Sequence, residues 1–239
     1  MDGPLILHIE TATDICSVAL SVGDQQLSLV ESGPERSHAT LLNAFIRRAF
    51  EESGRALDQM DAVAISKGPG SYTGLRIGVS TAKGLAYALE KPLLSSGTLD
   101  NMAYGALDHS YIQELAIKHG EELLLCPMLD ARRMEVYSCF YSTGMIVVRE
   151  VSADVIDSES YRKLLDKHHI CFFGNGSQKC KEVLDHPHAH FIHGLNPSAG
   201  QMIIPALGRF TQKQFEDVAY FEPFYLKDFV ATIPRKKVI

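Results

Sequence analysis

In the first hundred residues, short apolar runs alternate with segments of helical periodicity. Apolar residues recur at three-to-four spacing over 37–53, 74–89 and 99–107, which is typical of amphipathic helices. Ser37 is a candidate N-cap of the first helix, and Gly54 follows its last apolar position. Runs of strand length lie at 5–9, 16–22, 26–31, 62–65 and 93–94. The pattern predicts the order β-β-β-α-β-α-β-α.

The second half of the chain repeats this order. Strand-like runs lie at 123–129, 135–141, 146–151, 170–173 and 191–192, and helical segments at 160–168, 178–184 and 198–215. The first strand of each half ends in a carboxylate, Glu10 or Asp130, just before a turn. We therefore expect an α/β protein with two lobes, residues 1–100 and 101–239, and a cleft between them. A duplicated mixed sheet of this kind is the arrangement of the actin-like ATPase fold (ASKHA, RNase H-like).

Composition and charge narrow the class of protein. The 239 residues are 46% hydrophobic and 22% charged, which suits a globular chain with a sizeable core. The net charge is −6, whereas a protein that binds nucleic acid alone usually carries a basic face. The clear basic cluster is Arg235, Lys236 and Lys237, either a solvated tail or a phosphate contact. If RNA is involved, we expect a partner to supply most of the positive surface.

The cysteines and the N-terminal residues indicate in which cellular compartment we expect the protein. The number of cysteines is five, and no two have the spacing C-x-x-C, which argues against a disulfide framework or a cysteine zinc site. The N-terminus MDGPLILHIE lacks the basic and long apolar regions of a signal peptide, and no run approaches 18 apolar residues. We expect a cytoplasmic protein with reduced thiols and no membrane span.

The most specific motif is GPGSYTGLRIG, which runs from Gly68 to Gly78 between a predicted strand and a predicted helix. Its glycines let the backbone approach another group closely, and amides at a helix start favour an anion. Thr73 is a candidate cap. The motif is not a Walker A loop, because it lacks the ending G-K-[ST]. It is either a structural turn or a ligand-facing loop, whose candidate residues are Gly68, Gly70, Ser71 and Thr73.

The helix after this motif carries small residues on one face. Glycine within a helix costs about 1 kcal/mol relative to alanine, so a compensating contact is expected. Either the first helix of the same chain or another subunit approaches this face. We take the two helices as the candidate subunit interface, with the residues His38, Leu41, Leu42, Phe45, Gly74, Arg76, Gly78, Thr81 and Leu85.

Two further groups raise the question of metal binding. Glu10 and Asp130 either hold Mg²⁺ through water, as paired carboxylates of actin-like kinases do, or cap backbone amides. The histidines crowd at His168–His169 and at His186, His188, His190 and His193. Pro187 argues against a helical H-x-x-x-H pair within the crowded stretch. We interpret that stretch as a solvated loop and expect no metal site.

The motif at Gly68–Gly78 resembles the signature of the TsaB (YeaZ) family, G-P-G-S-[FY]-T-G-[LV]-R-[IV]-G, at every position. Three further stretches are similar to the family: ILHIETAT with CSVAL near the start, LDARRMEVY from Leu129, and EPFYLK from Glu222. Lys227 stands where arginine is usual, and Glu10 stands where many members carry aspartate. The similar stretches span nearly the whole chain.

The resemblance implies a non-catalytic subunit of the complex that makes threonylcarbamoyladenosine beside the anticodon of tRNA. It implies binding to the catalytic paralogue TsaD through helices of the first lobe, a homodimer in isolation, and a complex that the ATPase TsaE joins. Contact with tRNA would be indirect, and no cofactor is implied beyond weak ATP and Mg²⁺ binding. An actin-fold ATPase or kinase using Glu10, Asp130 and the Gly68 loop is the alternative, and a metallopeptidase is a third hypothesis.

Overall fold

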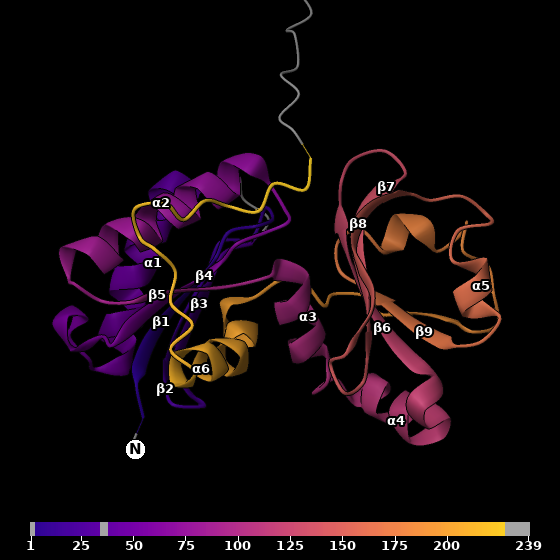
Figure 1. Cartoon of the computed structure of the whole chain (residues 1–239), viewed down its shortest axis with the longest axis horizontal. Coiled ribbons are helices and arrows are strands. Elements are labelled where there is room, and N and C mark those ends of the chain that lie inside the picture. Colours follow the sequence, from indigo (N-terminus) through magenta and orange to yellow (C-terminus); the bar gives the residue numbers. More distant parts are fainter. Residues whose placement is uncertain (1–2, 34–37, 228–239) are drawn as a thin grey trace, which may run out of the picture.

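The computed structural model describes residues 3–33 and 38–227. The candidate cap Ser37 and the basic cluster of Arg235, Lys236 and Lys237 lie outside these ranges. Figure 1 shows two lobes, each built on one twisted sheet, with α3 between them.

The first lobe contains a five-stranded mixed sheet of order β3-β2-β1-β4-β5. The first three strands pair antiparallel, and β1, β4 and β5 pair parallel. Alternate side chains of the central strand, β1, pack into two different hydrophobic cores. Leu5, Leu7 and Ile9 face one side of the sheet, and Ile6 faces the other. The strands are β1 (Leu5–Glu10), β2 (Ser17–Val22), β3 (Gln25–Glu31), β4 (Ala62–Ser66) and β5 (Leu93–Ser96).

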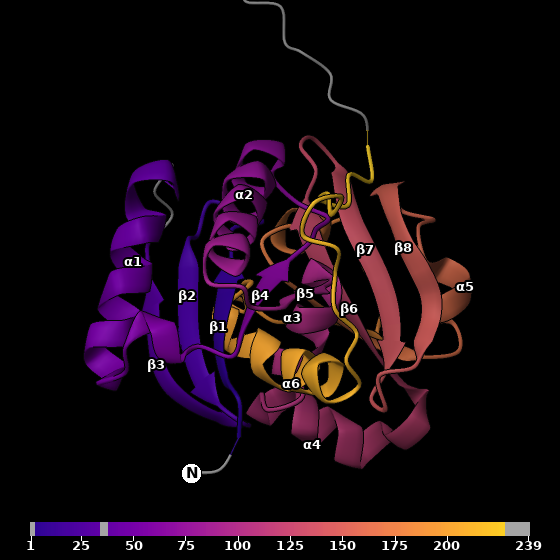
Figure 2. The same cartoon turned by 60° about the vertical axis from the view of Figure 1, so that its left-hand side comes forward.

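Helices cover both faces of this sheet. On one face lie α1 (His38–Ser53) and α2 (Tyr72–Ala88), side by side in Figure 2 and in contact with each other. As expected, α1 ends directly before Gly54, which adopts a φ of +66°. The other face is covered by the 3-10 turn η4 (Ala199–Met202) and α6 (Ile203–Thr211), whose Met202 and Ala206 pack on the sheet.

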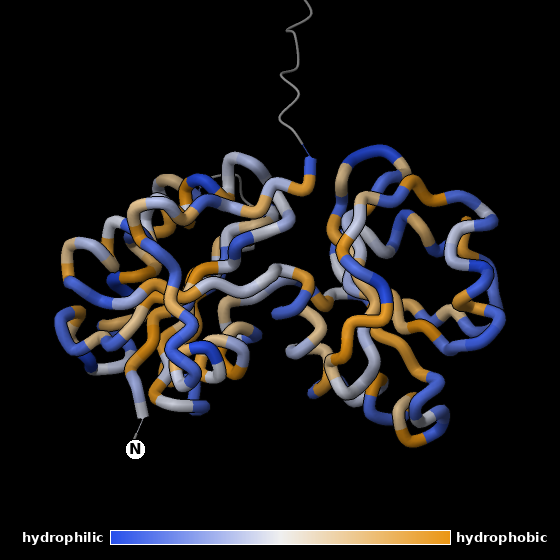
Figure 3. The backbone as a smooth tube through the Cα atoms, viewed as in Figure 1, coloured by the Kyte–Doolittle hydropathy of each residue, from blue (hydrophilic) through white to orange (hydrophobic). Residues whose placement is uncertain are grey.

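The second lobe repeats the topology of the first. Its sheet has the order β10-β9-β6-β7-β8, which again places the first strand of the unit at the centre. The duplicated sheets confirm the two-lobed actin-like fold. The strands are β6 (Leu123–Asp130), β7 (Glu135–Ser142), β8 (Val147–Val155), β9 (His169–Phe173) and β10 (Ala189–Phe191). In Figure 3 hydrophobic segments concentrate on interior strands of both lobes.

The helices of the second half differ from the prediction. The helix expected at 160–168 is only the four residues of α5 (Arg162–Leu165), and that expected at 178–184 is the 3-10 turn η3 (Gln178–Cys180). The helix expected at 198–215 begins as η4 and ends at Thr211. The pattern missed α4 (Ser110–His119), which follows α3 (Thr98–Ala106). Two further 3-10 turns are η1 (Leu57–Gln59) and η2 (Gly120–Glu122).

The C-terminal part of the chain returns to the first lobe. After α6, Glu216 forms an isolated antiparallel β-bridge with Leu93 of β5. The chain then runs along α2, where Lys83 Nζ donates hydrogen bonds to the carbonyl oxygens of Ala219 and Phe221 at 3.1 and 2.9 Å. Figure 1 shows this yellow segment beside α2. The expected boundary at residue 100 stays a prediction. Parts of the chain after that boundary nevertheless pack on the first lobe, through Met202, Ala206 and Phe221.

Candidate functional site

A cleft of about 630 Å³ opens where loops of the two lobes meet the C-terminal segment. The first lobe contributes the β1–β2 turn and the loop before α2, and the second contributes the end of β6 and the turn after β9. Its walls include three tyrosines. The lining residues are Ala12, Thr13, Asp14, Gly70, Ser71, Tyr72, Thr73, Leu129, Asp130, Ala131, Arg132, Tyr137, Asn175 and Phe224, Tyr225, Leu226 and Lys227.

The loop before α2 is held by close contacts between backbone segments. A Cβ on Gly70 would lie 2.4 Å from the carbonyl oxygen of Ala12. A Cβ on Gly68 would lie 2.7 Å from the carbonyl oxygen of Phe224, and the φ of Gly68 is +112°. Ser71 N–H also donates to Ala12 at 2.7 Å. These contacts within the chain account for Gly68 and Gly70 as parts of a structural turn.

Ser71, and not Thr73 as expected, caps α2. The helix begins at Tyr72, and the Ser71 hydroxyl accepts a hydrogen bond from Gly74 N–H at 3.3 Å. Both Ser71 and Thr73 are exposed and line the cleft. A role of these hydroxyls and of the α2 N-terminus in facing a phosphate stays a prediction.

Glu10 lies beneath the cleft and is not among its lining residues. Its side chain is fully buried, and Oε1 accepts a hydrogen bond from Ala12 N–H at 2.6 Å. Oε2 has no hydrogen-bond partner within the described residues. Burial raises the pKa of Glu10 to about 7, although hydrogen bonds from Ala12, Ser66 and Thr11 act in the opposite direction. The carboxyl group of Glu10 therefore stabilises the β1–β2 turn through its hydrogen bond with Ala12 N–H.

Asp130 does line the cleft, but its charge is already balanced. It forms an ion pair with Lys179, and it accepts a hydrogen bond from Arg132 N–H at 3.0 Å. Its own N–H donates to Asn175 Oδ1 at 3.0 Å. The structure thus does not place Glu10 and Asp130 together on the cleft wall. Their joint binding of Mg²⁺ stays a prediction.

The C-terminal segment closes one side of the cleft. Tyr225 packs against Tyr72 with ring centroids 4.8 Å apart, and Arg76 Nε donates to its hydroxyl at 3.3 Å. Lys227 pairs with Glu135 of the second lobe. Sequence reasoning missed the tyrosine wall. From the sequence, Gly174-Asn-Gly176 is either a second glycine loop for a phosphate or, as the preferred interpretation, a plain turn, and the structure places Asn175 on the cleft wall.

The residues expected at a subunit interface separate into two groups. His38, Leu42, Gly74 and Gly78 are buried within the chain, so they are unavailable to a partner in this structure. Leu41, Phe45, Thr81 and Leu85 are half-buried, and Arg76 is exposed. The half-buried apolar positions lie on neighbouring faces of α1 and α2 and pack against the first-lobe core.

Gly74 and Gly78 both face the β1–β2 turn, and Gly74 also lies close to His38, the first residue of α1. A Cβ on Gly74 would lie 2.1 Å from the carbonyl oxygen of Thr11, and one on Gly78 would lie 2.2 Å from Thr11 Oγ1. The closest approach, which we expected from another helix, is therefore made by the β1–β2 turn, and α1 adds a second contact at Gly74 through His38 Cδ2 at 3.3 Å. Of the expected interface, only the half-buried and exposed residues can meet a partner directly.

Comparison with known proteins covers almost the whole chain. The chain is 31% identical over 233 residues to the tRNA threonylcarbamoyladenosine biosynthesis protein TsaB of Escherichia coli, an alignment that covers 95% of this chain and 96% of the relative. This chain belongs to the TsaB family. The family model described as TsaD: tRNA N6-adenosine threonylcarbamoyltransferase also matches residues 32–235.

Further members and a solved structure extend the likeness. The TsaB protein of Haemophilus influenzae is 29% identical over 167 residues, which cover 70% of this chain and 64% of that protein. A Pseudomonas aeruginosa structure described as similar to peptidase YeaZ superposes with a TM-score of 0.75 and 25% identity, over 94% of this chain and 100% of that chain.

The structure places the TsaB-family motifs around the cleft. The Gly68–Gly78 signature, the turn after Glu10, the end of β6 and the EPFYLK segment all contribute to its walls or to their support. The five thiols are free and buried. Within residues 3–33 and 38–227, no helix combines the length and apolar character needed to cross a bilayer.

Proposed function

We propose that this TsaB-family chain is a non-catalytic partner subunit in the biosynthesis of threonylcarbamoyladenosine in tRNA, acting in the cytoplasm. The observation that carries the proposal is the alignment with E. coli TsaB, which covers 95% of this chain. Because the alignment includes both lobes and the cleft motifs, the likeness is not confined to a shared fold.

The cleft geometry supports a role without chemistry of its own. Phosphoryl transfer in an actin-like cleft needs carboxylates that hold Mg²⁺ against the phosphates. Here Glu10 is fully buried behind the cleft wall, and Asp130 is paired with Lys179. A metal bound by Asp130 would share this carboxylate with the ammonium group of Lys179.

The partner that we propose is TsaD, and the contact surface is the exposed side of α1 and α2, called here the helix face (Leu41, Phe45, Thr81 and Leu85). Its apolar side chains are partly exposed on two adjacent helices, which is the composition of an interface core. The same face would pair two copies in the homodimer that we propose for the isolated chain. Through TsaD, the chain would work with the ATPase TsaE and meet tRNA only indirectly.

A reconstitution experiment tests this proposal. Purified chain and TsaD of the same organism should form a complex, and tRNA modification should fall when the chain is omitted. Leu85→Glu should weaken the complex at least tenfold, about 1.4 kcal/mol. Ile146→Glu is the matched control, because Ile146 is an exposed apolar residue of the second lobe, 70% exposed.

Three outcomes would contradict the proposal in different ways. If modification proceeds equally without the chain, the role as a partner subunit is wrong. If Leu85→Glu binds TsaD as wild type does, only the helix face is wrong. If the isolated chain turns over Mg-ATP, the alternative of an actin-fold ATPase or kinase replaces the non-catalytic role.

A further inference from the structure

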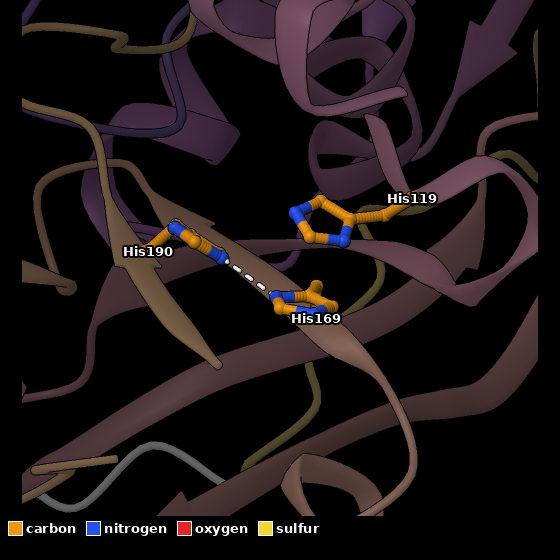
Figure 4. A group of neighbouring side chains, drawn as sticks. All are labelled: His119, His169 and His190. Carbon is orange, nitrogen blue, oxygen red and sulfur yellow. Dashed lines mark hydrogen bonds between the residues drawn. The ribbon is translucent and has the colours of Figure 1, made fainter. Parts of the chain in front are cut away.

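Three histidines from distant parts of the sequence meet at one edge of the second lobe (Figure 4). His119 is the last residue of α4, His169 is the first residue of β9, and His190 is the middle residue of β10. We call them the histidine cluster. The interpretation of the histidine-rich stretch as a solvated loop is wrong for His190, which belongs to a strand and is half-buried.

The strand register brings the cluster together. In the parallel pair of β9 and β10, His190 lies opposite Cys171, and His169 shares a face with Cys171 because it is two residues away. Cys171 belongs to the core that α4 covers through Ile112 and Leu115. Both strand histidines therefore point toward α4, and its final residue completes the cluster.

The ring nitrogens of the three histidines lie close together. One ligand nitrogen from each histidine lies within 4.8 Å of the other two. His169 Nδ1 is 3.0 Å from His190 Nε2, and the rings of His119 and His169 stack with centroids 3.5 Å apart. Among the described residues His119 Nε2 has no hydrogen-bond partner, although it is buried.

Neighbouring groups orient the rings further. The hydroxyl of Tyr111 is 3.3 Å from His190 Nδ1, which leaves Nε2 directed toward His169. The ring of His188 lies beside that of His169, tilted by 38° with centroids 4.1 Å apart, and His188 Nδ1 lies 2.8 Å from the carbonyl oxygen of Leu165. Outer contacts of this kind are what fix the orientation of metal-binding imidazoles.

We propose that His119, His169 and His190 bind a divalent transition-metal ion of the zinc class, with one coordination position left to water. Three imidazoles without a carboxylate suit Zn²⁺ and its neighbours, and not Ca²⁺ or Mg²⁺. A tetrahedral ion with Zn–N bonds of about 2.0–2.1 Å holds its nitrogens about 3.3 Å apart. The observed nitrogen spacing brackets this value, and binding requires the stacked rings of His119 and His169 to rotate until both lone pairs point at the ion.

A bound ion would connect the end of α4 to both strands, because its three ligands come from α4, β9 and β10.

Metal titration of the full, tag-free chain tests the site. After treatment with a chelator, the chain should bind one Zn²⁺ in calorimetry, and Co²⁺ should give the visible absorption of a tetrahedral site. His119→Gln and His169→Gln should each weaken Zn²⁺ binding at least tenfold. His193→Gln is the matched control, because His193 is exposed, follows the same strand and lies outside the cluster.

The proposal fails if the wild-type chain shows no saturable binding of one ion. It also fails if either cluster variant binds Zn²⁺ as tightly as wild type, or if His193→Gln loses as much affinity as they do. Far-UV circular dichroism shows whether each variant folds. Should a variant not fold, the Co²⁺ spectrum of wild type decides, since an octahedral aquo-type spectrum would overturn the assignment.

Discussion

Replacing Gly78 by alanine tests why α2 carries a glycine on its inner face. The new Cβ would lie 2.2 Å from Thr11 Oγ1, 3.3 Å from Thr11 Cβ and 3.0 Å from Ile65 Cδ1. Thr11 and Ile65 are both fully buried, so neither can swing into solvent. The first of these distances is far below van der Waals contact, and α2 or the β1–β2 turn must shift to accept the methyl group.

The expected magnitude follows from two opposing effects. Overpacking a well-packed core costs about 1–3 kcal/mol. Alanine is the better helix former by about 1 kcal/mol, which offsets part of that cost. We expect Gly78→Ala to lower the free energy of unfolding by up to about 2 kcal/mol. Gly84→Ala is the matched control on the same helix, because Gly84 is exposed and, among the described residues, nothing beyond the adjacent backbone of α2 lies within 4 Å of its Cβ position. It should raise stability by about 1 kcal/mol.

A double-mutant cycle identifies the contact responsible. Thr11→Ala removes Oγ1, which is buried and has no hydrogen-bond partner among the described residues, so its own cost should be small. In that background Gly78→Ala should cost at least about 1 kcal/mol less than in wild type. The assay is urea unfolding of the full chain followed by circular dichroism, with m-values compared among all variants.

Two results would refute this reasoning. Gly78→Ala could be as stable as Gly84→Ala, which would mean that the Thr11 contact does not require a glycine. Alternatively, Gly78→Ala could retain its stability yet no longer bind TsaD, and the glycine would then belong to the subunit interface expected from the sequence alone.

Three further predictions concern pH and local hydrogen bonds. Between pH 4.5 and about 7, Glu10 keeps its proton in the folded chain but loses it in the unfolded chain, so the free energy of unfolding falls as the pH rises. Urea unfolding at pH 5–8 should show this loss, up to about 3 kcal/mol, in the wild type but not in Glu10→Gln. Burial pushes the pKa of Asp154 upward, but hydrogen bonds from Arg149, Ser138 and Tyr161 hold it at about 2. Asp154→Asn should therefore lower the free energy of unfolding by about 2 kcal/mol near pH 7, and by less as the pH falls from 3.8 toward 2. A variant as stable as the wild type at pH 7 would show that these hydrogen bonds to Asp154 do not stabilise the fold. Ser71→Ala should lower the thermal midpoint by losing about 1 kcal/mol of capping energy, while Thr73→Ala should change it little; the reverse order would restore Thr73 as the cap.

Much of the first lobe could be predicted from its sequence. Leu5, Leu7 and Ile9 alternate with Ile6, and a strand with buried residues on both faces belongs at the centre of a sheet. The end of α1 before Gly54 and the turn at Gly68 also depend on local backbone preferences, which the chain encodes within a few residues. The repeat of this order in the second half was sufficient to predict the two lobes and the cleft.

Local patterns failed where a few long-range contacts decide the structure. Within α4 only Ile112 and Leu115 are buried, which is too short a stripe to distinguish a helix from a loop. In the region 178–184, Cys180 and Leu184 are both buried in the second-lobe core although η3 covers only Gln178–Cys180. Burial at a spacing of four residues therefore did not require a helix.

What the sequence determined by itself was the order of elements, the family resemblance and the presence of small residues on α2, because each depends on residues close together in the chain. Tertiary structure alone decided which groups meet. It set Thr11 against Gly78, paired Asp130 with Lys179 and turned Glu10 inward, and it joined His119 to His169 and His190 through strand register. Such contacts depend on the relative position of whole elements, and no local pattern carries that information.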